Sequence, residues 1–195
     1  MWVKQGIMKF KVTALSIPDI LLIEPTVYAD DRGYFKENYN LNDFEEFLPG
    51  VKFVQDNESK SSRGVLRGLH FQKAPHAQAK LVRCVQGSIW DVAVDIRSAS
   101  PMYRQHAAVV LSAENHHQLF IPKGFAHGFI VTSETAIVQY KTDNFYEAAA
   151  DGGIHPHDSE LNIPWPISDS EHILSNKDNG LPLLSEVIRD RLSPI

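Results

Sequence analysis

Cysteine is almost absent from this chain of 195 residues, because Cys84 is the only one. A single thiol excludes an internal disulfide framework and a metal site built from several cysteines, and it fits a reducing compartment. Long apolar runs are also missing. None approaches the roughly 18 residues that a membrane-spanning helix needs, and the first ten residues lack the apolar core of a signal peptide. The sequence therefore predicts a cytoplasmic protein with no membrane segment.

An excess of positive charge is missing as well. The 19 Lys and Arg residues against 24 Asp and Glu residues give a net charge of -5, and no basic block stands out. This pattern argues against a nucleic-acid partner but allows a small anion held by a few arginines. The 43% of hydrophobic residues is typical of a globular protein. We expect one domain over residues 1–195, with 1–14 as an N-terminal extension or first strand and 185–195 as a C-terminal tail.

Short runs rich in Val, Ile, Phe and Tyr fill the middle of the chain and are separated by Gly, Pro, Asn and Ser. They recur at roughly the 8–12-residue spacing of an all-β sandwich or barrel. The expected strands are residues 52–55, 65–72, 80–85, 88–96, 107–111, 118–121, 129–131 and 135–142. Helical signals are confined to residues 42–48 and 185–192, and residues 148–182 have the composition of long loops.

One of these runs alternates clearly between apolar and charged residues. Trp90, Val92 and Val94 share one face of the expected strand 88–96, and Asp91 and Asp95 share the other. The simplest account of this pattern is a half-buried strand in a sheet.

Residues 122–129, PKGFAHGF, combine a tight Pro-x-Gly turn with His127 at the start of the next strand. This spacing resembles the second motif of the cupin superfamily. The resemblance implies an all-β fold, a cupin-type double-stranded β-helix (jelly-roll) barrel with short flanking helices. Metal-dependent cupins carry an earlier H-x-H pair, where this chain has His70 and Gln72, followed by Lys80. A protonated lysine has no lone pair and repels a cation, so we expect no bound metal. A purely structural role for His127 is the alternative.

A second cluster is more specific. Residues 65–72, VLRGLHFQ, place Arg67 and His70 inside an apolar strand, where charged groups are costly unless they are paired or face a cavity. Together with residues 80–83 and 91–97, this string resembles the dTDP-4-dehydrorhamnose 3,5-epimerase family. The resemblance runs in order over residues 15–184 and includes DRGYFKE at 31–37, FVQDNES at 53–59, IPKGFAHGF at 121–129, YK at 140–141, WP at 165–166 and LSNKD at 174–178.

The resemblance implies an epimerase that inverts C3 and C5 of dTDP-4-dehydro-6-deoxy-D-glucose to give dTDP-4-dehydro-L-rhamnose, with no cofactor. A 4-keto sugar has acidified protons on both sides of its carbonyl. Inversion therefore needs a base on one face, an acid on the other, and a group that stabilises the enolate oxygen. By this resemblance, His70 is the base, Asp178 is its partner, Lys80 lies beside the C4 oxygen, and Tyr140 is the acid.

The same resemblance implies a substrate-binding set: Arg32, Glu37, Gln55, Asn57, Arg67, Lys80, His127, Asp151 and Lys177. Parity places Phe53, Gln55 and Asn57 on one face of their strand. Arg67 and His70 are three residues apart, so they face opposite ways in a regular strand. Either Gly68 hosts a bulge that reconciles them, or Arg67 serves the site of a neighbouring subunit.

The chain departs from the family pattern in a few places. Ala79 precedes Lys80 where the family has glycine, Asp151 stands where many members have glutamate, and residues 153–158 replace a more usual Trp-Asn-Asp ending. Phe145 and Tyr146 share the region of the aromatic residue that stacks on the nucleotide base. These departures leave the identity of that base open.

The family resemblance also implies a homodimer with exchanged strands, for which residues 15–60 are the candidate segment. Three alternatives to the main interpretation remain. They are an epimerase that acts at C3 or C5 alone on a related nucleotide 4-keto sugar, a non-catalytic nucleotide-sugar-binding cupin, and a metal-dependent cupin oxygenase or isomerase. Outside the expected site, Cys84 is predicted to be a buried small hydrophobe, and the loop histidines at 116–117 and 155–157 to be exposed.

Overall fold

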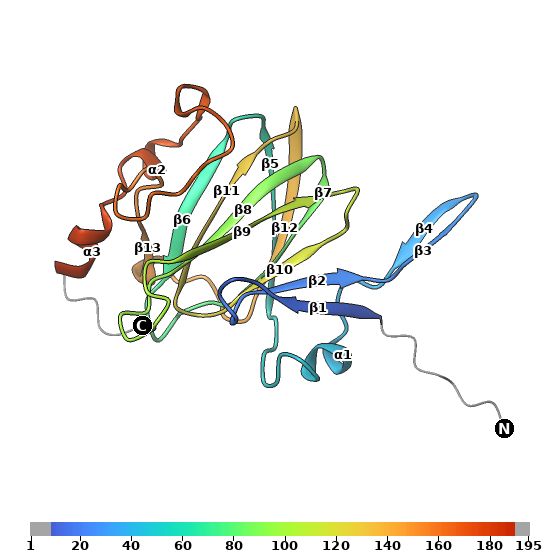
Figure 1. The fold of residues 1–195 in the computed structure, drawn as a ribbon. Helices are drawn as coiled ribbons and strands as arrows, with labels where there is room; N and C mark the ends of the chain where they lie inside the picture. The colour runs from blue at the N-terminus through green and yellow to red at the C-terminus, as the bar shows by residue number, and fades with distance from the viewer. Residues whose placement is uncertain (1–8, 190–195) are drawn as a thin grey trace.

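The computed structural model describes residues 9–189, which form two facing antiparallel sheets and a separate hairpin (Figure 1). In spatial order the six-stranded sheet contains β1 (Phe10–Ala14), β2 (Leu21–Pro25), β10 (Gln118–Ile121), β7 (Lys80–Gln86), β12 (Thr135–Thr142) and β5 (Gln55–Ser62). The five-stranded sheet contains β13 (Asp151–Gly153), β6 (Leu66–Gln72), β11 (Phe125–Val131), β8 (Ser88–Asp95) and β9 (His106–Ser112). The hairpin pairs β3 (Val27–Asp30) with β4 (Gly33–Lys36).

Helices are few and short, as expected for this fold class. They are α1 (Leu41–Glu45), the 3-10 turns η1 (Ala148–Ala150) and η2 (Asp169–Glu171), α2 (Asn176–Asn179) and α3 (Leu184–Arg189). The all-β prediction and the short flanking helices are confirmed.

The main core lies between the two sheets. Val82, Ile89, Ala93, Leu111 and Phe129 are all buried in one cluster, with side chains from both sheets. Interdigitation of two inner faces is the way in which double-sheet jelly rolls bury their apolar residues. Cys84 belongs to this cluster and is 3% exposed, so its prediction as a buried hydrophobe is confirmed.

The outer face of the five-stranded sheet is covered by the C-terminal part of the chain. Val92 and Val94 of β8 pack against Ile154, Leu161 and Leu184 in a second cluster. In Figure 1 the segment that carries α2 and α3 lies against this sheet near β6 and β13.

This cover corrects the expectation of a half-buried strand at 88–96. Asp91 and Asp95 are each 0% exposed, so β8 is buried on both faces. Its charged face points into the protein, where Asp91 meets His127 and Asp95 meets Arg97 and Ser100. Buried carboxylates of this kind need such partners.

Several element boundaries also differ from the prediction. The strand expected at 52–55 begins only at Gln55 and runs to Ser62, and Phe53 lies before it, packed beside Tyr39. The polar sequence QDNESKSS carries no apolar alternation, so its pattern of partly buried and exposed positions was not visible in the sequence. The helix expected at 42–48 begins at Leu41 with Asn40 as its cap. Of the helix expected at 185–192, residues 190–192 lie outside the described part of the chain, as do residues 1–8 of the expected N-terminal extension.

A β-bulge in β6 resolves the parity problem of Arg67 and His70. In the pairing with β11, His70 lies opposite His127 and Arg67 lies opposite Phe129, so two residues of β6 face the single residue Gly128. Gly68, with φ of 137°, is the first of these two residues. The extra residue turns both side chains to the same face, and the bulge alternative is confirmed.

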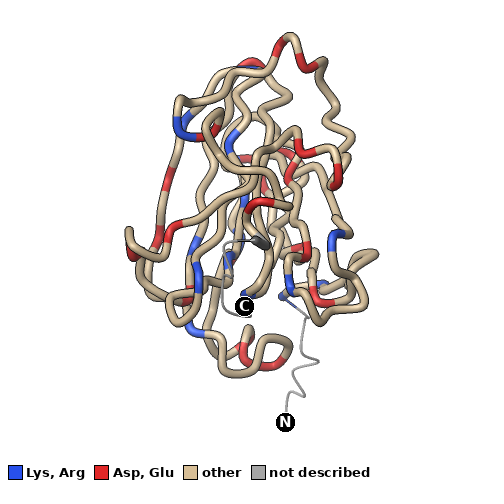
Figure 2. The backbone as a smooth tube through the Cα atoms, turned by 90° about the vertical axis from the view of Figure 1, so that its left-hand side faces the viewer, with Lys and Arg blue, Asp and Glu red and all other residues tan. Residues whose placement is uncertain are grey.

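No helix within residues 9–189 is long and apolar enough to cross a membrane. Acidic and basic positions are both scattered around the described part of the chain (Figure 2).

The bulge predicts unequal costs for two glycine substitutions. A Cβ at Gly68 would lie 2.6 Å from the Cα of Gly128, whereas a Cβ at Gly33, whose φ of 129° is similar, would meet nothing within 4 Å. Gly33→Ala should therefore lower the free energy of unfolding only through its backbone conformation, by about 1–2 kcal/mol. Gly68→Ala adds a clash with backbone and should cost about 3 kcal/mol or more. Urea unfolding of both variants measures the difference, and equal losses would contradict this account of the bulge.

Candidate active site

A histidine and an aspartate that are distant in sequence meet at one edge of the barrel interior. The Nε2 atom of His70, on β6, lies 2.6 Å from Oδ1 of Asp178, on α2. The Asp178 side chain is 6% exposed and that of His70 is 31% exposed, so the imidazole keeps an open side. A buried carboxylate in this position orients the ring and stabilises its protonated form.

The local structure of α2 holds this carboxylate in place. Ser175 caps the helix, and its Oγ accepts a hydrogen bond from the backbone N–H of Asp178 at 3.0 Å. Burial by itself raises the pKa of Asp178, but the hydrogen bond and charge of His70, with help from Ser175 and Lys177, bring the pKa below its ordinary value. Asp178 is therefore ionised at neutral pH.

A second histidine–aspartate pair lies deeper in the same interior. His127, on β11, is directly opposite His70 in the strand pairing, and its Nε2 lies 3.0 Å from Oδ2 of Asp91 on β8. The side chains are 7% and 0% exposed. Burial lowers the pKa of His127 more than Asp91 raises it, and the positive charge of Lys80 acts in the same direction as burial. The ring is thus neutral at neutral pH.

Lys80 brings a cation to these groups from the opposite sheet. It begins β7, and its Nζ lies 3.4 Å from the backbone oxygen of His70. Burial lowers the pKa of Lys80 to about 8, although the negative charges of Asp91 and Asp151 oppose this effect. A weakly solvated ammonium near neutrality is suited to stabilising an oxyanion that forms beside it.

Tyr140 occupies the wall that faces His70. It lies on β12 opposite Val82 of β7, whose side chain is part of the inter-sheet core, and Tyr140 packs against that same core. Burial raises the pKa of its phenol, with Arg67 acting in the opposite direction. The phenol is therefore protonated at neutral pH and can serve as an acid.

The expected substrate-binding residues of β5 and β6 line the same interior. Asn57 lies opposite Tyr140 in the sheet and accepts a hydrogen bond from Gln55 at 2.9 Å. Arg67 reaches from β6 to Ser61 on β5, with Nε and Oγ 3.1 Å apart. These contacts bring two amides and a guanidinium together where β5 faces β6.

Asp151 and Lys177 form an ion pair at the edge next to α2. The phenol of Tyr146 lies 3.4 Å from the same Asp151 oxygen, and the backbone N–H of Tyr146 donates to Gln55. Phe145 and Tyr146 are 65% and 55% exposed, so both aromatic rings present surface to solvent.

The structure does not bring Arg32 and Glu37 to this site. Arg32 lies in the turn between β3 and β4, has a 90% exposed side chain, and binds Asp30. Glu37 follows β4 and pairs with Lys9 at 2.8 Å. Figure 1 shows the β3–β4 hairpin extending away from the two sheets on the side opposite α2.

Two residues of this region were not predicted as part of the site. The alternation in residues 88–96 places Asp91 on the polar face of its strand, and it carries no signal that this face is buried. The sequence presents Gln72 only at the position of a cupin metal ligand. Its buried side chain instead binds the backbone of His76, Phe145 and Glu147, and so it fixes the loop that carries the two exposed aromatics.

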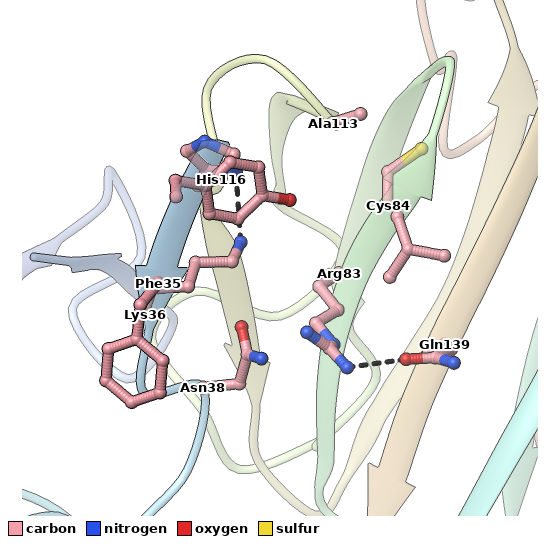
Figure 3. Close-up of a pocket in the computed structure, with 10 residues that line it drawn as sticks. Phe35, Lys36, Asn38, Arg83, Cys84, Ala113, His116 and Gln139 are labelled. Carbon is pink, nitrogen blue, oxygen red and sulfur yellow. Dashed lines mark hydrogen bonds between the residues drawn. The ribbon is translucent and has the colours of Figure 1, made fainter. Parts of the chain in front are cut away.

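A separate pocket of about 390 Å³ contains none of the expected site residues (Figure 3). Lys36 and His116 meet there at 3.0 Å, and Arg83 bonds to Gln139. Burial, together with the charge of Arg83, lowers the pKa of Lys36 to about 8.

Two paired histidines, a lysine and a tyrosine held between the sheets of a jelly roll define a cupin-type enzyme equipped for proton transfer. The model of the family described as dTDP-4-dehydrorhamnose 3,5-epimerase matches residues 14–186. The dTDP-4-dehydrorhamnose 3,5-epimerase of Salmonella typhimurium is 51% identical over 178 residues, which cover 91% of this chain and 97% of that protein. The enzyme of the same name from Escherichia coli K12 is 52% identical over 182 residues, with coverages of 93% and 98%. The chain therefore belongs to the dTDP-4-dehydrorhamnose 3,5-epimerase family.

Solved structures agree with this assignment. The dTDP-6-deoxy-D-glucose-3,5-epimerase of Legionella pneumophila in complex with dTDP-4-keto-L-rhamnose superposes with a TM-score of 0.90 at 42% identity, covering 95% of this chain and 98% of that one. A 3'-monoepimerase from Streptomyces bikiniensis in complex with dTDP-quinovose gives 0.87 at 32% identity, with coverages of 93% and 91%. The cupin-type fold prediction is confirmed.

The buried His127–Asp91 pair predicts a specific response to pH. The midpoint of His127 should lie below 6.5, and Asp91→Asn should lower it further, because the substitution removes the charge that favours the protonated ring. Two-dimensional NMR of the histidine ring C–H groups measures the midpoint, with His127→Gln for assignment. Asp56→Asn, which removes an exposed carboxylate bound to Lys141, is the matched control and should leave the midpoint unchanged. A midpoint that rises in Asp91→Asn would contradict this electrostatic account.

Proposed function

We propose that this chain inverts C3 and C5 of dTDP-4-dehydro-6-deoxy-D-glucose and so forms dTDP-4-dehydro-L-rhamnose. The observation that carries the proposal is the 2.6 Å contact between His70 and Asp178, which lies next to Lys80 and across the barrel from Tyr140. This arrangement supplies a base, an acid and a cation to one ligand.

The chemistry needs only proton transfers. The C4 carbonyl acidifies the protons at C3 and C5, because removal of either one gives an enolate whose charge lies on the C4 oxygen. His70 takes the proton, and ionised Asp178 stabilises the imidazolium that results. Lys80, with neutral His127 beside it, stabilises the oxyanion.

Inversion further requires that the proton return from the opposite face of the ring. His70 belongs to the five-stranded sheet and Tyr140 to the six-stranded sheet. A sugar bound between the sheets therefore has the base on one side and the phenol on the other. Tyr140 delivers the second proton.

The nucleotide part is assigned to the remaining polar groups. Arg67 suits a diphosphate, because a guanidinium forms paired hydrogen bonds with phosphate oxygens. Gln55 and Asn57 offer amides, and Tyr146 contacts Asp151 of the Asp151–Lys177 pair. We assign the exposed rings of Phe145 and Tyr146 to stacking with the base.

Epimerisation at a single carbon is the second candidate, since the chain is also similar to a 3'-monoepimerase. The same base and acid serve either reaction, and the pose of the sugar decides between them.

We further propose that the chain is a single-domain cytoplasmic protein that acts as a homodimer. The β3–β4 hairpin supports the dimer, because it pairs with neither large sheet and exposes Tyr28, Tyr34 and Phe35 by 46%, 60% and 69%. An isolated two-stranded hairpin is marginally stable, and aromatic side chains gathered on it favour a partner surface. Exchange of this hairpin would carry Arg32 and, with it, Glu37 to the second barrel. Of the expected exchange segment 15–60, we assign the exchange to residues 27–37, because β2 and β5 pair with strands of their own chain.

Hydrogen exchange in deuterated water tests the proposed reaction. Wild-type protein should replace the C3 and C5 protons of dTDP-4-dehydro-6-deoxy-D-glucose by deuterium with inversion, as followed by NMR. His70→Ala should lose exchange by about 10²- to 10⁴-fold while it still binds dTDP. Tyr140→Phe should keep exchange through His70 but lose inversion by a similar factor.

Tyr103→Phe, which removes a phenol outside the barrel interior, is the control and should behave as wild type. Exchange at one carbon alone would identify the single-carbon epimerase, and binding without any exchange would identify a non-catalytic protein.

Subunit mixing tests the exchanged hairpin. Arg32→Ala and His70→Ala should each be inactive alone, but half of the dimers in an equal refolded mixture combine one subunit of each kind. Every mixed dimer has one intact site, so activity should return to about one quarter of the wild-type value. A mixture of the Arg32→Ala/His70→Ala double variant with Arg32→Ala should stay inactive, because no subunit in it carries Arg32. Failure of the first mixture to regain activity, or a monomer by light scattering, would rule out sharing of the hairpin.

A further inference from the structure

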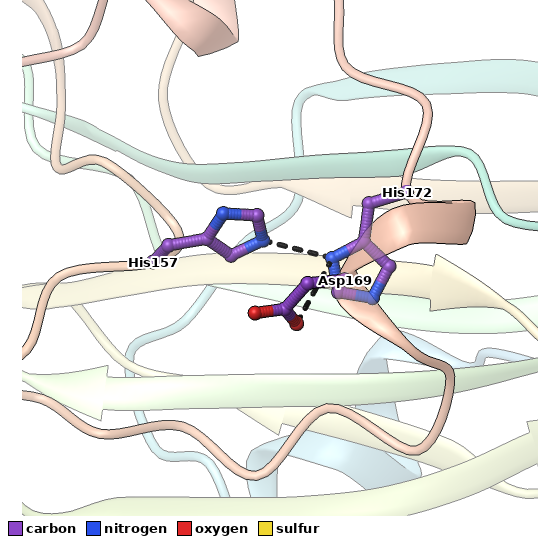
Figure 4. Close-up of side chains that lie close together, drawn as sticks. All are labelled: His157, Asp169 and His172. Atoms are coloured by element: carbon purple, nitrogen blue, oxygen red, sulfur yellow. Dashed lines mark hydrogen bonds and ion pairs between the residues drawn. The ribbon is translucent and has the colours of Figure 1, made fainter.

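Three potential metal ligands lie together outside the proposed active site (Figure 4). Nε2 of His157 is 2.8 Å from Nδ1 of His172, and Oδ1 of Asp169 is 3.7 Å from the same Nδ1. One ligand atom from each residue lies within 4.8 Å of the others. All three residues belong to the C-terminal segment that covers the five-stranded sheet, and none of them has a part in the proposed reaction.

His172 is fixed in a way that leaves one nitrogen available. Its side chain is 1% exposed, and its Nε2 lies 2.9 Å from the backbone oxygen of Ile167. A carbonyl oxygen only accepts, so Nε2 carries the proton and Nδ1 of the neutral ring carries a lone pair directed at His157. Metal-binding histidines are oriented in the same manner, by donating their second ring N–H to a carbonyl or carboxylate.

The spacing of the three groups requires little adjustment for a cation. With metal–nitrogen bonds of about 2.0–2.1 Å and tetrahedral angles, two ligand nitrogens lie about 3.3 Å apart. The two imidazole nitrogens thus need to separate by about 0.5 Å, and the proton between them must move to the other nitrogen of His157. The Asp169 side chain is 77% exposed and is free to rotate its carboxylate toward the pair.

We propose that His157, Asp169 and His172 bind one divalent cation of the class that prefers imidazole, with zinc as the representative ion and water completing its coordination. Two neutral imidazoles with one carboxylate suit Zn²⁺ better than Mg²⁺ or Ca²⁺, which prefer oxygen ligands.

The cation would act as a clamp on the fold. His157 and His172 are 15 residues apart, so one ion closes the loop between them. Ile173, the next residue, forms a bridge with Val65 immediately before β6, and Ser175 caps the helix that carries Asp178. The bound ion would therefore fix residues 157–172, which lead to the bridge at Ile173 and to the helix that carries Asp178.

Isothermal titration of the untagged full-length protein with zinc sulfate tests the site. Wild-type protein should bind one equivalent per chain, and zinc at about a hundredfold excess over its Kd should raise the Tm by roughly 5–10 °C. Even a residue that only supports a metal ligand is worth about 10- to 100-fold in metal affinity. His157→Ala should therefore weaken binding by at least that factor, and Asp169→Asn should weaken it as well.

His117→Ala is the matched control, because this partly exposed histidine pairs with Glu24 and lies outside the cluster, and it should leave zinc affinity unchanged. Circular dichroism without zinc establishes whether each variant is folded. If His157→Ala does not fold, Asp169→Asn is the decisive variant, because Asp169 is exposed. Absence of saturable zinc binding by the wild type would overturn the proposal. Binding that is unchanged in the cluster variants, or weakened equally by His117→Ala, would overturn it too.

Discussion

The burial of ionisable groups between two sheets is the constraint on which this structure depends. A charge removed from water must find a partner, and the interior meets this demand in pairs: Asp91 with His127, and Asp178 with His70. Lys80 differs from them. Within the described part of the chain it forms no ion pair and contacts only a backbone oxygen, while Asp91 and Asp151 act on it from farther away. The incompletely compensated cation thus lies where the proposed reaction generates a negative oxygen.

The parts of the fold that depend on apolar periodicity could be predicted from the sequence. Residues 65–72, 80–85, 107–111, 118–121 and 135–142 all fall on or overlap observed strands, because their side chains fill the inter-sheet core. Polar strands gave no such signal. β5 has no apolar residue, and its order comes from pairing with β12, which is a long-range contact that a local pattern cannot encode. β3 and β4 do contain apolar residues, but every position except Lys36 is exposed, so these two strands lack the alternation of a strand that packs on the core.

The sequence predicted which residues belong to the site better than it predicted how they are arranged. The residues came from a family resemblance, and the structure brings most of them to one interior. The bulge at Gly68 explains how Arg67 and His70 share a face, which parity alone left undecided. The burial of Asp91 could not be read from strand alternation, because the cover on the outer face of β8 comes from a segment more than fifty residues later in the chain. Arg32 lies in the turn of the β3–β4 hairpin, away from this interior, because the hairpin pairs with neither large sheet.

The His70–Asp178 contact also has a consequence for the synthesis of the protein. The two residues are separated by 108 positions, which a ribosome takes about 5–20 s to translate. Throughout that interval the emerging chain carries the base without its carboxylate, and the outer face of β8 without the segment that covers it. The protein thus becomes competent for chemistry and loses its exposed apolar sheet surface in the same final step. Until that step the nascent chain is the form most in need of a chaperone.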